Sequence, residues 1–365
     1  MVRDCVFTGN SAAAGAGFFC WGGEPLIDGC EFMENSARGF GGGIGTEAGG
    51  FPRIQGSRFF NNEAGDGGGV CISASDAIIS RCDVQGNVAD FGGGMSVVSA
   101  MSVLIDRSVI AGNRSSTSGG GVHILYSGVD MQRSSVVFNE CDGTGGGIYG
   151  HQSEIMVTTT AVSHNEDAGL LLDGGSASIE YADIFGNHGG EIEGEPPPGV
   201  GILTGTNTNG DSIDVYSNIF LDPEYLGDDV FNLLLHESSP LIDAGNPGLS
   251  LDHDGSVADI GAYPYVSPLV LEVSVNGNRF DLQWSENDQT WAYCAYGTNS
   301  TIHFNPSEGQ ILEEFPEEIT NWSTDVGFGD SENQWVFRVV AVDRYEREIT
   351  RSNIGGEFEL DWNIP

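Results

Sequence analysis

The chain has 365 residues and a formal net charge of −40, since 53 acidic residues face 13 basic ones, all of them arginine. This charge would repel nucleic acids and anionic lipid surfaces, so we exclude both as partners. No apolar run approaches the roughly 18 residues of a membrane-spanning helix. A hydrophobic content of 39% argues against disorder, and 55 glycines are typical of a fold that is rich in turns.

An asparagine recurs along the first half of the chain at intervals of 22 to 27 residues. An apolar residue stands three positions before each of these asparagines, a small residue stands five positions before it, and a glycine cluster follows most of them. Such a period indicates one supersecondary unit stacked on itself. The recurring residues are Asn10, Asn35, Asn62, Asn87, Asn113, Asn139, Asn165 and Asn187.

Each repeat continues, after its glycines, with a few residues in apolar and polar alternation, which predicts a strand with one buried face. Frequent Gly, Asn and Ser argue against a helix in the unit, and the leucine ladder of leucine-rich repeats is missing. The remaining solution is an all-β parallel solenoid whose coils lie about 4.8 Å apart. We expect the Asn column to form hydrogen bonds along the axis and the glycines to allow sharp corners, so both columns are structural.

Three repeats, Cys5–Ala12, Cys30–Ile44 and Cys82–Met95, resemble the right-handed parallel β-helix repeats of secreted bacterial proteins. They are also similar to the repeat of polymorphic outer-membrane proteins. This resemblance implies an extracellular or cell-surface location. Since the chain opens inside a coil and without a signal peptide, we expect the natural protein to have earlier coils and a leader.

A second resemblance follows the repeats. Ser239–Gly248, Asp252–Gly255 and Asp259–Tyr263 resemble the segment that closes many such β-helices, although the usual arginine between the last two elements is missing. We therefore assign residues 1–266 to the β-helix with its closing segment. Residues 267–365 show strands at sandwich-like spacing. They resemble a fibronectin type III domain, with Trp284 on an inner strand and Trp335 where that family often has a tyrosine.

The candidate ligand site follows from the strand after each glycine cluster. Its second and fourth residues point outward, so stacking brings His123, Tyr149, His151 and Asp173 onto one face within about 10 Å along the axis. Imidazole, phenol and carboxylate groups side by side could hold a sugar, with His or Asp as general acid or base. The alternative is an exposed sheet face of mixed polar residues.

A second line of acidic residues falls between the Asn and Gly columns. Carboxylates on successive coils repel one another unless cations lie between them, so calcium is a candidate ligand. The alternative is a set of solvated turn residues; no cofactor is otherwise required. The line consists of Asp66, Asp90, Asp142 and Asp167.

Many β-helix proteins act on polysaccharides, but the sequence lacks the catalytic motifs of two such classes. A calcium-dependent lyase would need a Lys or Arg base beside clustered carboxylates, but lysine is absent and the coil arginines fall mostly near turns. The paired aspartates of galacturonases are not in the coils; Asp228–Asp229 lies beyond them. A hydrolase could still use Asp173 with Asp142 or Glu166 as its two carboxylates.

The sequence thus predicts a secreted or cell-surface β-helix protein for adhesion or binding of a polysaccharide or cell-surface glycan, with no identifiable catalytic motif. One alternative is a polysaccharide lyase or glycoside hydrolase that acts on the exposed β-helix face. The other is a calcium-stabilised structural spacer. The sequence does not predict an oligomeric state.

Overall fold

A computed structural model of the chain describes residues 1–227, 233–252, 255–265, 271–276, 279–284, 292–298, 310–316, 321–324, 336–342 and 348–351. Asp228–Asp229, Asp254 and Trp335 lie outside these residues. The chain divides into two compact units, Met1–Tyr265 and Val266–Pro365. In the part of the chain that is described, no helix is long and apolar enough to cross a membrane.

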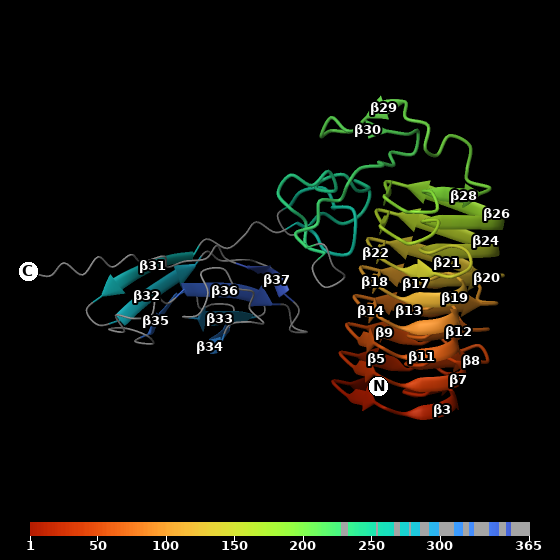
Figure 1. The fold of residues 1–365 in the computed structure, drawn as a ribbon, viewed down its shortest axis with the longest axis horizontal. Coiled ribbons are helices and arrows are strands. Elements are labelled where there is room, and N and C mark those ends of the chain that lie inside the picture. The colour runs from red at the N-terminus through yellow and green to blue at the C-terminus, as the bar shows by residue number, and fades with distance from the viewer. Residues whose placement is uncertain are drawn as a thin grey trace, which may run out of the picture. The chain divides into compact units, whose positions relative to one another are not determined.

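The first unit is a parallel β-solenoid, in which each coil lies directly on the one before it (Figure 1). Three parallel sheets, which we call sheets 1, 2 and 3, run along its length. The parallel solenoid predicted from the asparagine period is confirmed.

Sheet 1 has 14 strands in two columns, which merge in the upper coils. The first column consists of β1 (Val2–Arg3), β5 (Leu26–Asp28), β9 (Arg53–Gln55), β13 (Ala77–Ser80), β17 (Val103–Asp106) and β21 (Gly128–Gln132). The second consists of β4 (Phe18–Trp21), β8 (Ile44–Glu47), β12 (Val70–Ser73), β16 (Met95–Val98) and β20 (Val122–Leu125). The strands that span both columns, or end them, are β24 (Ile148–Thr158), β26 (Leu170–Glu180) and β28 (Ile192–Gly194).

Sheets 2 and 3 hold one strand from each coil that contributes to them. Sheet 2 consists of β2 (Val6–Thr8), β6 (Glu31–Met33), β10 (Arg58–Phe60), β14 (Asp83–Gln85), β18 (Val109–Ala111), β22 (Ser135–Val137), β25 (Ala161–Ser163) and β27 (Asp183–Phe185). Sheet 3 consists of β3 (Ser11–Ala14), β7 (Ser36–Phe40), β11 (Glu63–Asp66), β15 (Val88–Phe91), β19 (Arg114–Ser118) and β23 (Glu140–Cys141).

The asparagine column forms a continuous ladder at the corner between sheets 2 and 3. In each step the side-chain NH2 of one Asn donates to the Oδ1 of the Asn in the next coil, as from Asn87 to Asn113 at 2.9 Å and from Asn113 to Asn139 at 3.0 Å. The same amide of Asn113 also donates to the Val84 carbonyl at 2.8 Å. Because the side chain is buried, these bonds replace the water that it has lost. The column thus hydrogen-bonds successive coils to one another along the axis.

The glycine clusters have two separate causes. The first glycine of each cluster turns a corner in the left-handed region, as at Gly67 with φ of 63°. The second and third glycines lie where the next coil approaches closely: a Cβ on Gly68 would lie 2.4 Å from the carbonyl oxygen of Gly93. The corners therefore require glycine both for its conformation and for its small size.

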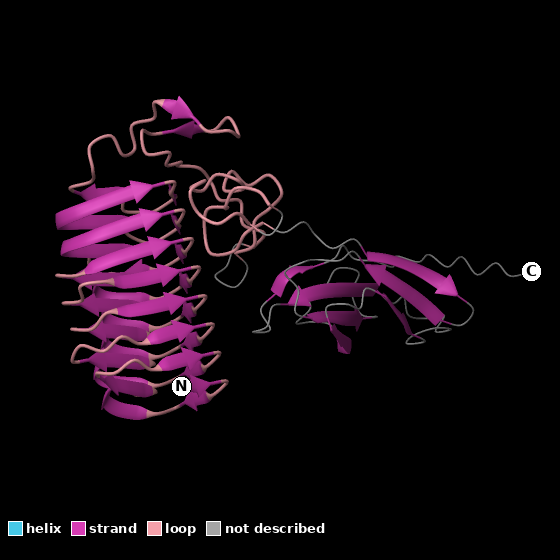
Figure 2. Cartoon of the chain, turned by 180° about the vertical axis from the view of Figure 1, so that it is seen from behind, coloured by secondary structure: helices cyan, strands magenta, loops and turns pink. Residues whose placement is uncertain are grey.

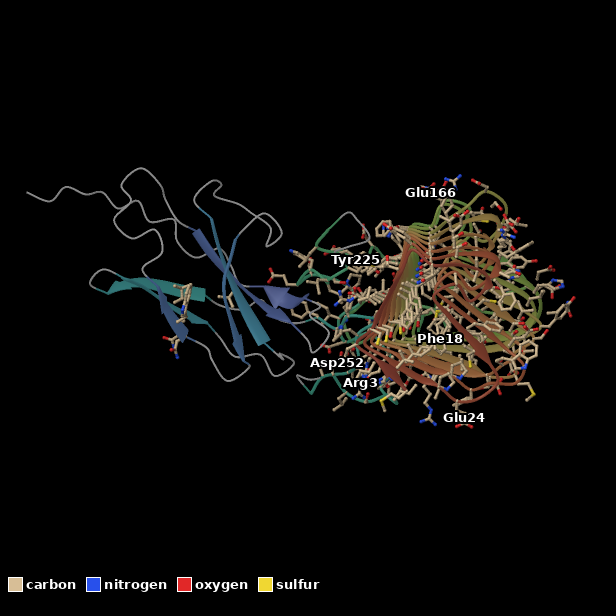
Figure 3. The ribbon with its side chains drawn as sticks, turned by 90° about the horizontal axis from the view of Figure 1, so that it is seen from below. Arg3, Phe18, Glu24, Glu166, Tyr225 and Asp252 are labelled. Atoms are coloured by element: carbon tan, nitrogen blue, oxygen red, sulfur yellow. The ribbon has the colours of Figure 1, made fainter. Side chains whose placement is uncertain are left out.

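The interior is a column of apolar side chains from sheets 1 and 2, while Ala37 and Ala64 of sheet 3 form a separate small cluster with Ala16. Phe7, Phe32 and Phe59 stack with ring centroids 4.8 and 4.9 Å apart, and branched residues continue the column through the later coils. Seen along the axis, Phe18 points into this interior (Figure 3). Each coil buries its apolar residues only against its neighbours, as the repeat predicted.

Residues beyond the last coil fold back along the outside of sheet 2, mostly as loops (Figure 2). Ile219 first bridges Asp183 of β27, and the chain then descends. Leu241 and Ile260 pack against Ala161, and the backbone NH of Ala262 donates to the Ser135 hydroxyl at 3.0 Å. The motifs that resemble a closing segment thus cover a side of the solenoid.

Between the coils and this segment, β29 (Gly205–Thr206) and β30 (Ser212–Ile213) form a small antiparallel pair. The second unit contains two small antiparallel sheets. One consists of β31 (Leu271–Asn276), β32 (Arg279–Trp284) and β35 (Asn321–Thr324). The other consists of β34 (Gln310–Pro316), β33 (Ala292–Thr298), β36 (Val336–Val342) and β37 (Glu348–Arg351). The fibronectin type III sandwich stays a prediction.

Candidate ligand-binding face on sheet 1

The outward side of the second strand column of sheet 1 is called here the sheet-1 face. It is formed by two lines of side chains, one beginning at Phe19 and the other at Trp21. In the upper coils, His123 pairs with Tyr149 and then Leu171, while Leu125 pairs with His151 and then Asp173. The structure therefore brings the four predicted site residues onto neighbouring coils of one face.

His123 differs from the expectation because it is buried, with 6% of its surface exposed. Its ring lies between Phe91 and Tyr149, with centroids 5.3 and 5.4 Å away, and it is parallel to the tyrosine. Phe91 ends its strand in sheet 3 and reaches over the neighbouring line of sheet 1. Burial, followed by the charge of His151, lowers the pKa of His123 to about 4. At neutral pH His123 is an uncharged ring beneath the surface.

Tyr149, His151 and Asp173 form the accessible polar part of the face. His151 Nδ1 lies 2.6 Å from Asp173 Oδ2, and the Tyr149 hydroxyl donates to the same oxygen at 3.4 Å. Burial raises the pKa of Tyr149, and the nearby Asp173 carboxylate raises it further. The three groups offer a ligand a phenol, an imidazole edge and a carboxylate.

Tyr126 adds an aromatic side chain that the sequence did not predict at this site. It is 59% exposed, and its ring meets His151 edge-on at 5.5 Å. Its φ of 50° is uncommon for a bulky residue; the equivalent turn positions hold Ala74 and Ser99, also at positive φ. A tyrosine at a turn position that holds Ala74 and Ser99 in earlier coils was therefore the feature of the sequence that could have indicated this side chain.

The sequence also did not predict a second aromatic group, which consists of two residues of the first coil and one of the next. Phe19 lies 6.3 Å from Trp21 and 6.0 Å from Phe40, measured between ring centroids. Trp21 is 70% exposed. The first coil has Gly15 and Gly17 in place of three consecutive glycines, so it was not aligned with the other strands.

The predicted aspartate line is not a single column. Asp66 pairs with Phe91 in sheet 3, so Asp90, the residue before Phe91, lies one position out of line with Asp66. Asp142 forms an ion pair with Arg114 at 2.8 Å, and Asp167 accepts the Gly145 backbone NH at 2.6 Å. Burial and the neighbouring Asp90 raise the pKa of Asp66. Among the described residues, no group of three His, Cys, Asp or Glu is placed to hold a metal. Calcium binding stays a prediction.

The carboxylates suggested as a hydrolytic pair have separate partners. Asp173 contacts His151, Asp142 contacts Arg114, and Glu166 lies 2.9 Å from His188. Glu166 lies at the edge of the axial view, and Tyr225 and Asp252 lie on the side of the closing segment (Figure 3). The arrangement favours Asp173 as a partner of imidazole and phenol over a role in a two-carboxylate site.

Comparison with known proteins agrees with this architecture. Residues 1–127 match the model of a family described as "Right handed beta helix region". No curated protein matches the chain. The parallel coils continue through β28 in the same stack, so the matched residues and the later coils form one parallel β-solenoid, and the matched part is similar to right-handed β-helix proteins.

Proposed function

We propose that the protein binds glycans on the sheet-1 face, as a secreted or cell-surface protein of adhesion. The observation that supports this proposal is the exposed group of Tyr149, His151 and Asp173 beside the ring of Tyr126. Binding sites for small molecules combine aromatic walls with a few polar groups that fix orientation. A sugar presents both an apolar face for the rings and hydroxyls for the carboxylate and imidazole.

The charge of the face favours neutral glycans over acidic ones. Neither of its two side-chain lines contains an arginine, and the lines include Glu47 and Asp173. A uronate or sulfate group would meet negative potential both there and from the whole chain, whose net charge is −40. Hydroxyl groups can instead donate hydrogen bonds to the Asp173 carboxylate.

The second candidate is an enzyme that acts on the same ligand. It is favoured by the 2.6 Å contact between His151 and Asp173, since a carboxylate that holds an imidazole can orient it as a general acid or base. The Tyr149 hydroxyl would then position the substrate. An enzyme would bind its substrate on the same face, and it would differ from a binding protein only in that it cleaves a bond of the glycan.

Affinity electrophoresis in gels that contain neutral or uronate polysaccharides tests the binding proposal. We expect a neutral polysaccharide to retard the wild type, and Tyr149→Ala and His151→Ala to weaken binding about tenfold, as the loss of about 1.4 kcal/mol would do. Val88→Ala serves as the control, because Val88 is an exposed strand residue of sheet 3. No retardation in any gel, or equal retardation of all variants, would contradict the proposal.

Incubation of the protein with the same polysaccharides, with and without Ca²⁺, distinguishes the two candidates. Release of new reducing or unsaturated ends that His151→Ala abolishes would favour the enzyme. Retardation without any depolymerisation would favour a binding protein.

A further inference from the structure

A second exposed aromatic group lies on the sheet-1 face, far from the Tyr149 site. Phe19 and Trp21 begin the two lines of side chains, Phe40 of sheet 3 lies beside Phe19, and Trp21 is among the most exposed large apolar residues of the first unit. Exposed apolar side chains that gather in one place mark interaction surfaces more often than isolated ones do. The fold offers no internal reason for this group, because the core of the coil is filled by Phe7 and Phe18.

The register fixes the separation of the two aromatic groups. Starting at Trp21, the outer line passes through Glu47, Ser73, Val98 and Leu125 before it reaches His151. These are five steps between coils, or about 24 Å along the axis at about 4.8 Å each. A single sugar unit cannot contact both groups, whereas an extended chain can.

The surface between the groups suits an uncharged polymer. Val98 and Leu125 are partly exposed there, Phe91 adds a ring that is 36% exposed, and Glu47 is the one ionisable residue of the outer line between Trp21 and His151. Apolar side chains can contact the faces of sugar rings, and the carboxylate can accept a hydrogen bond from a hydroxyl. A polyanion would find no cationic side chain in either line.

We infer that the sheet-1 face binds one extended neutral polysaccharide chain along the solenoid axis, with Phe19, Trp21 and Phe40 as a second subsite. This inference rests on the proposed function and adds the class and orientation of the ligand. Contact at both ends makes the second binding event intramolecular, so a polymer that spans both subsites binds more tightly than a short fragment.

The test compares Trp21→Ala and Phe19→Ala with the wild type in binding a neutral polysaccharide and its short oligosaccharides, by affinity electrophoresis and calorimetry. Val6→Ala is the matched control, because Val6 lies in β2 of the same coil, in sheet 2, and is 58% exposed. We expect both aromatic variants to bind the polymer at least tenfold more weakly and to bind short fragments as the wild type does. Unchanged unfolding temperatures would show that the coil is intact.

Four results would overturn the inference. Equal binding of the polymer by wild type and Trp21→Ala would show that there is no second subsite, but it would not contradict the proposed function. Failure of the wild type to bind any glycan would contradict both the second subsite and the proposed function. Stronger binding of an acidic polymer would contradict the ligand class. Self-association in sedimentation that Trp21→Ala abolishes would assign the aromatic group to an interface between copies of this chain.

Discussion

Sheets 1 and 2 belong to the same solenoid, but among the described residues of the first unit the closing segment packs on the outward face of sheet 2 and leaves the sheet-1 face free. In the middle and upper coils of sheet 2, the strand residues are buried on both sides, as in β18, β22 and β25. Earlier strands of the same sheet, β6 and β10, bury only their central residue. The closing segment therefore covers mostly small and apolar residues of the sheet, and it also reaches β14, where the Tyr263 hydroxyl donates to Asp83 at 3.2 Å.

The sheet-1 face has a different composition. Beside aliphatic residues such as Val98 and Leu125 it carries aromatic, polar and acidic ones, as at Trp21, Tyr149 and Asp173, and among the described residues of the first unit no such segment folds over these three. The comparison shows that the outward side chains distinguish the covered face of this solenoid from its free face, while both sheets turn apolar side chains inward. Outward residues of sheet 2 therefore contribute to stability, and outward residues of the sheet-1 face are accessible to a ligand.

The largest expected effect comes from placing a charge on each face in turn. Val137 is fully buried on sheet 2 and packs with Val109, Leu233 and Ala262. Val137→Asp would leave an unpaired carboxylate there and should cost more than about 3 kcal/mol of stability. Leu125→Asp on the sheet-1 face should cost less than about 1 kcal/mol. Chemical unfolding measures both, and equal losses would remove the distinction between the faces.

The asparagine ladder should come next, because it lies at a corner that both faces share. Asn113→Ala removes the donor to Val84 and Asn139 and the acceptor for Asn87, all within the buried interior. We expect a loss of about 3 kcal/mol from the unsatisfied groups that remain. Asn209→Ala is the control, since Asn209 is exposed and makes its bond at the surface. A loss for Asn113→Ala no larger than for the control would contradict the structural role of the ladder.

His123 should make the folded protein less stable in acid, because it is buried in the sheet-1 face. In the unfolded chain it takes up a proton near pH 6.5, but in the folded protein only near pH 4. The unfolded state therefore binds more protons between these values, and stability falls as the pH falls through them, by about 3 kcal/mol in total. His123→Phe keeps the ring stack and should remove this fall.

The measurement is the difference between wild type and His123→Phe in unfolding free energy, followed from pH 7 to pH 4. Other buried groups, such as Asp259 with its pKa near 7, are present in both proteins and cancel in the difference. A constant difference across this range would show that His123 is protonated alike in both states.

The sequence was sufficient for the coils and for the register of the candidate site. The asparagine positions fixed which residues stack, so His151 above Leu125 and Tyr149 above His123 followed from counting along the chain. Strand alternation then distinguished inward from outward side chains. These features repeat in every coil, and a repeat makes them visible in one sequence.

The sequence was not sufficient where a single coil departs from the repeat. His123 is buried because Phe91 of sheet 3 reaches over it. The repeat period shows which residues stack within a sheet, but it does not show which large side chain of another sheet covers them. Asp66 and Asp90 do not pair, because Asp66 stands one position further from Asn62 than Asp90 does from Asn87. Tyr126 and Trp21 were missed because one occupies a turn and the other a coil with fewer glycines.

Binding of a neutral polysaccharide by Leu125→Asp tests most directly whether the free face of sheet 1 is the ligand-binding surface. Leu125 lies in the outer line directly before His151, so a carboxylate there adds charge to the centre of the face and leaves the core unchanged. We predict a protein with nearly the unfolding temperature of the wild type that the polysaccharide no longer retards. Retardation equal to that of the wild type, in a variant that is equally folded, would contradict the account.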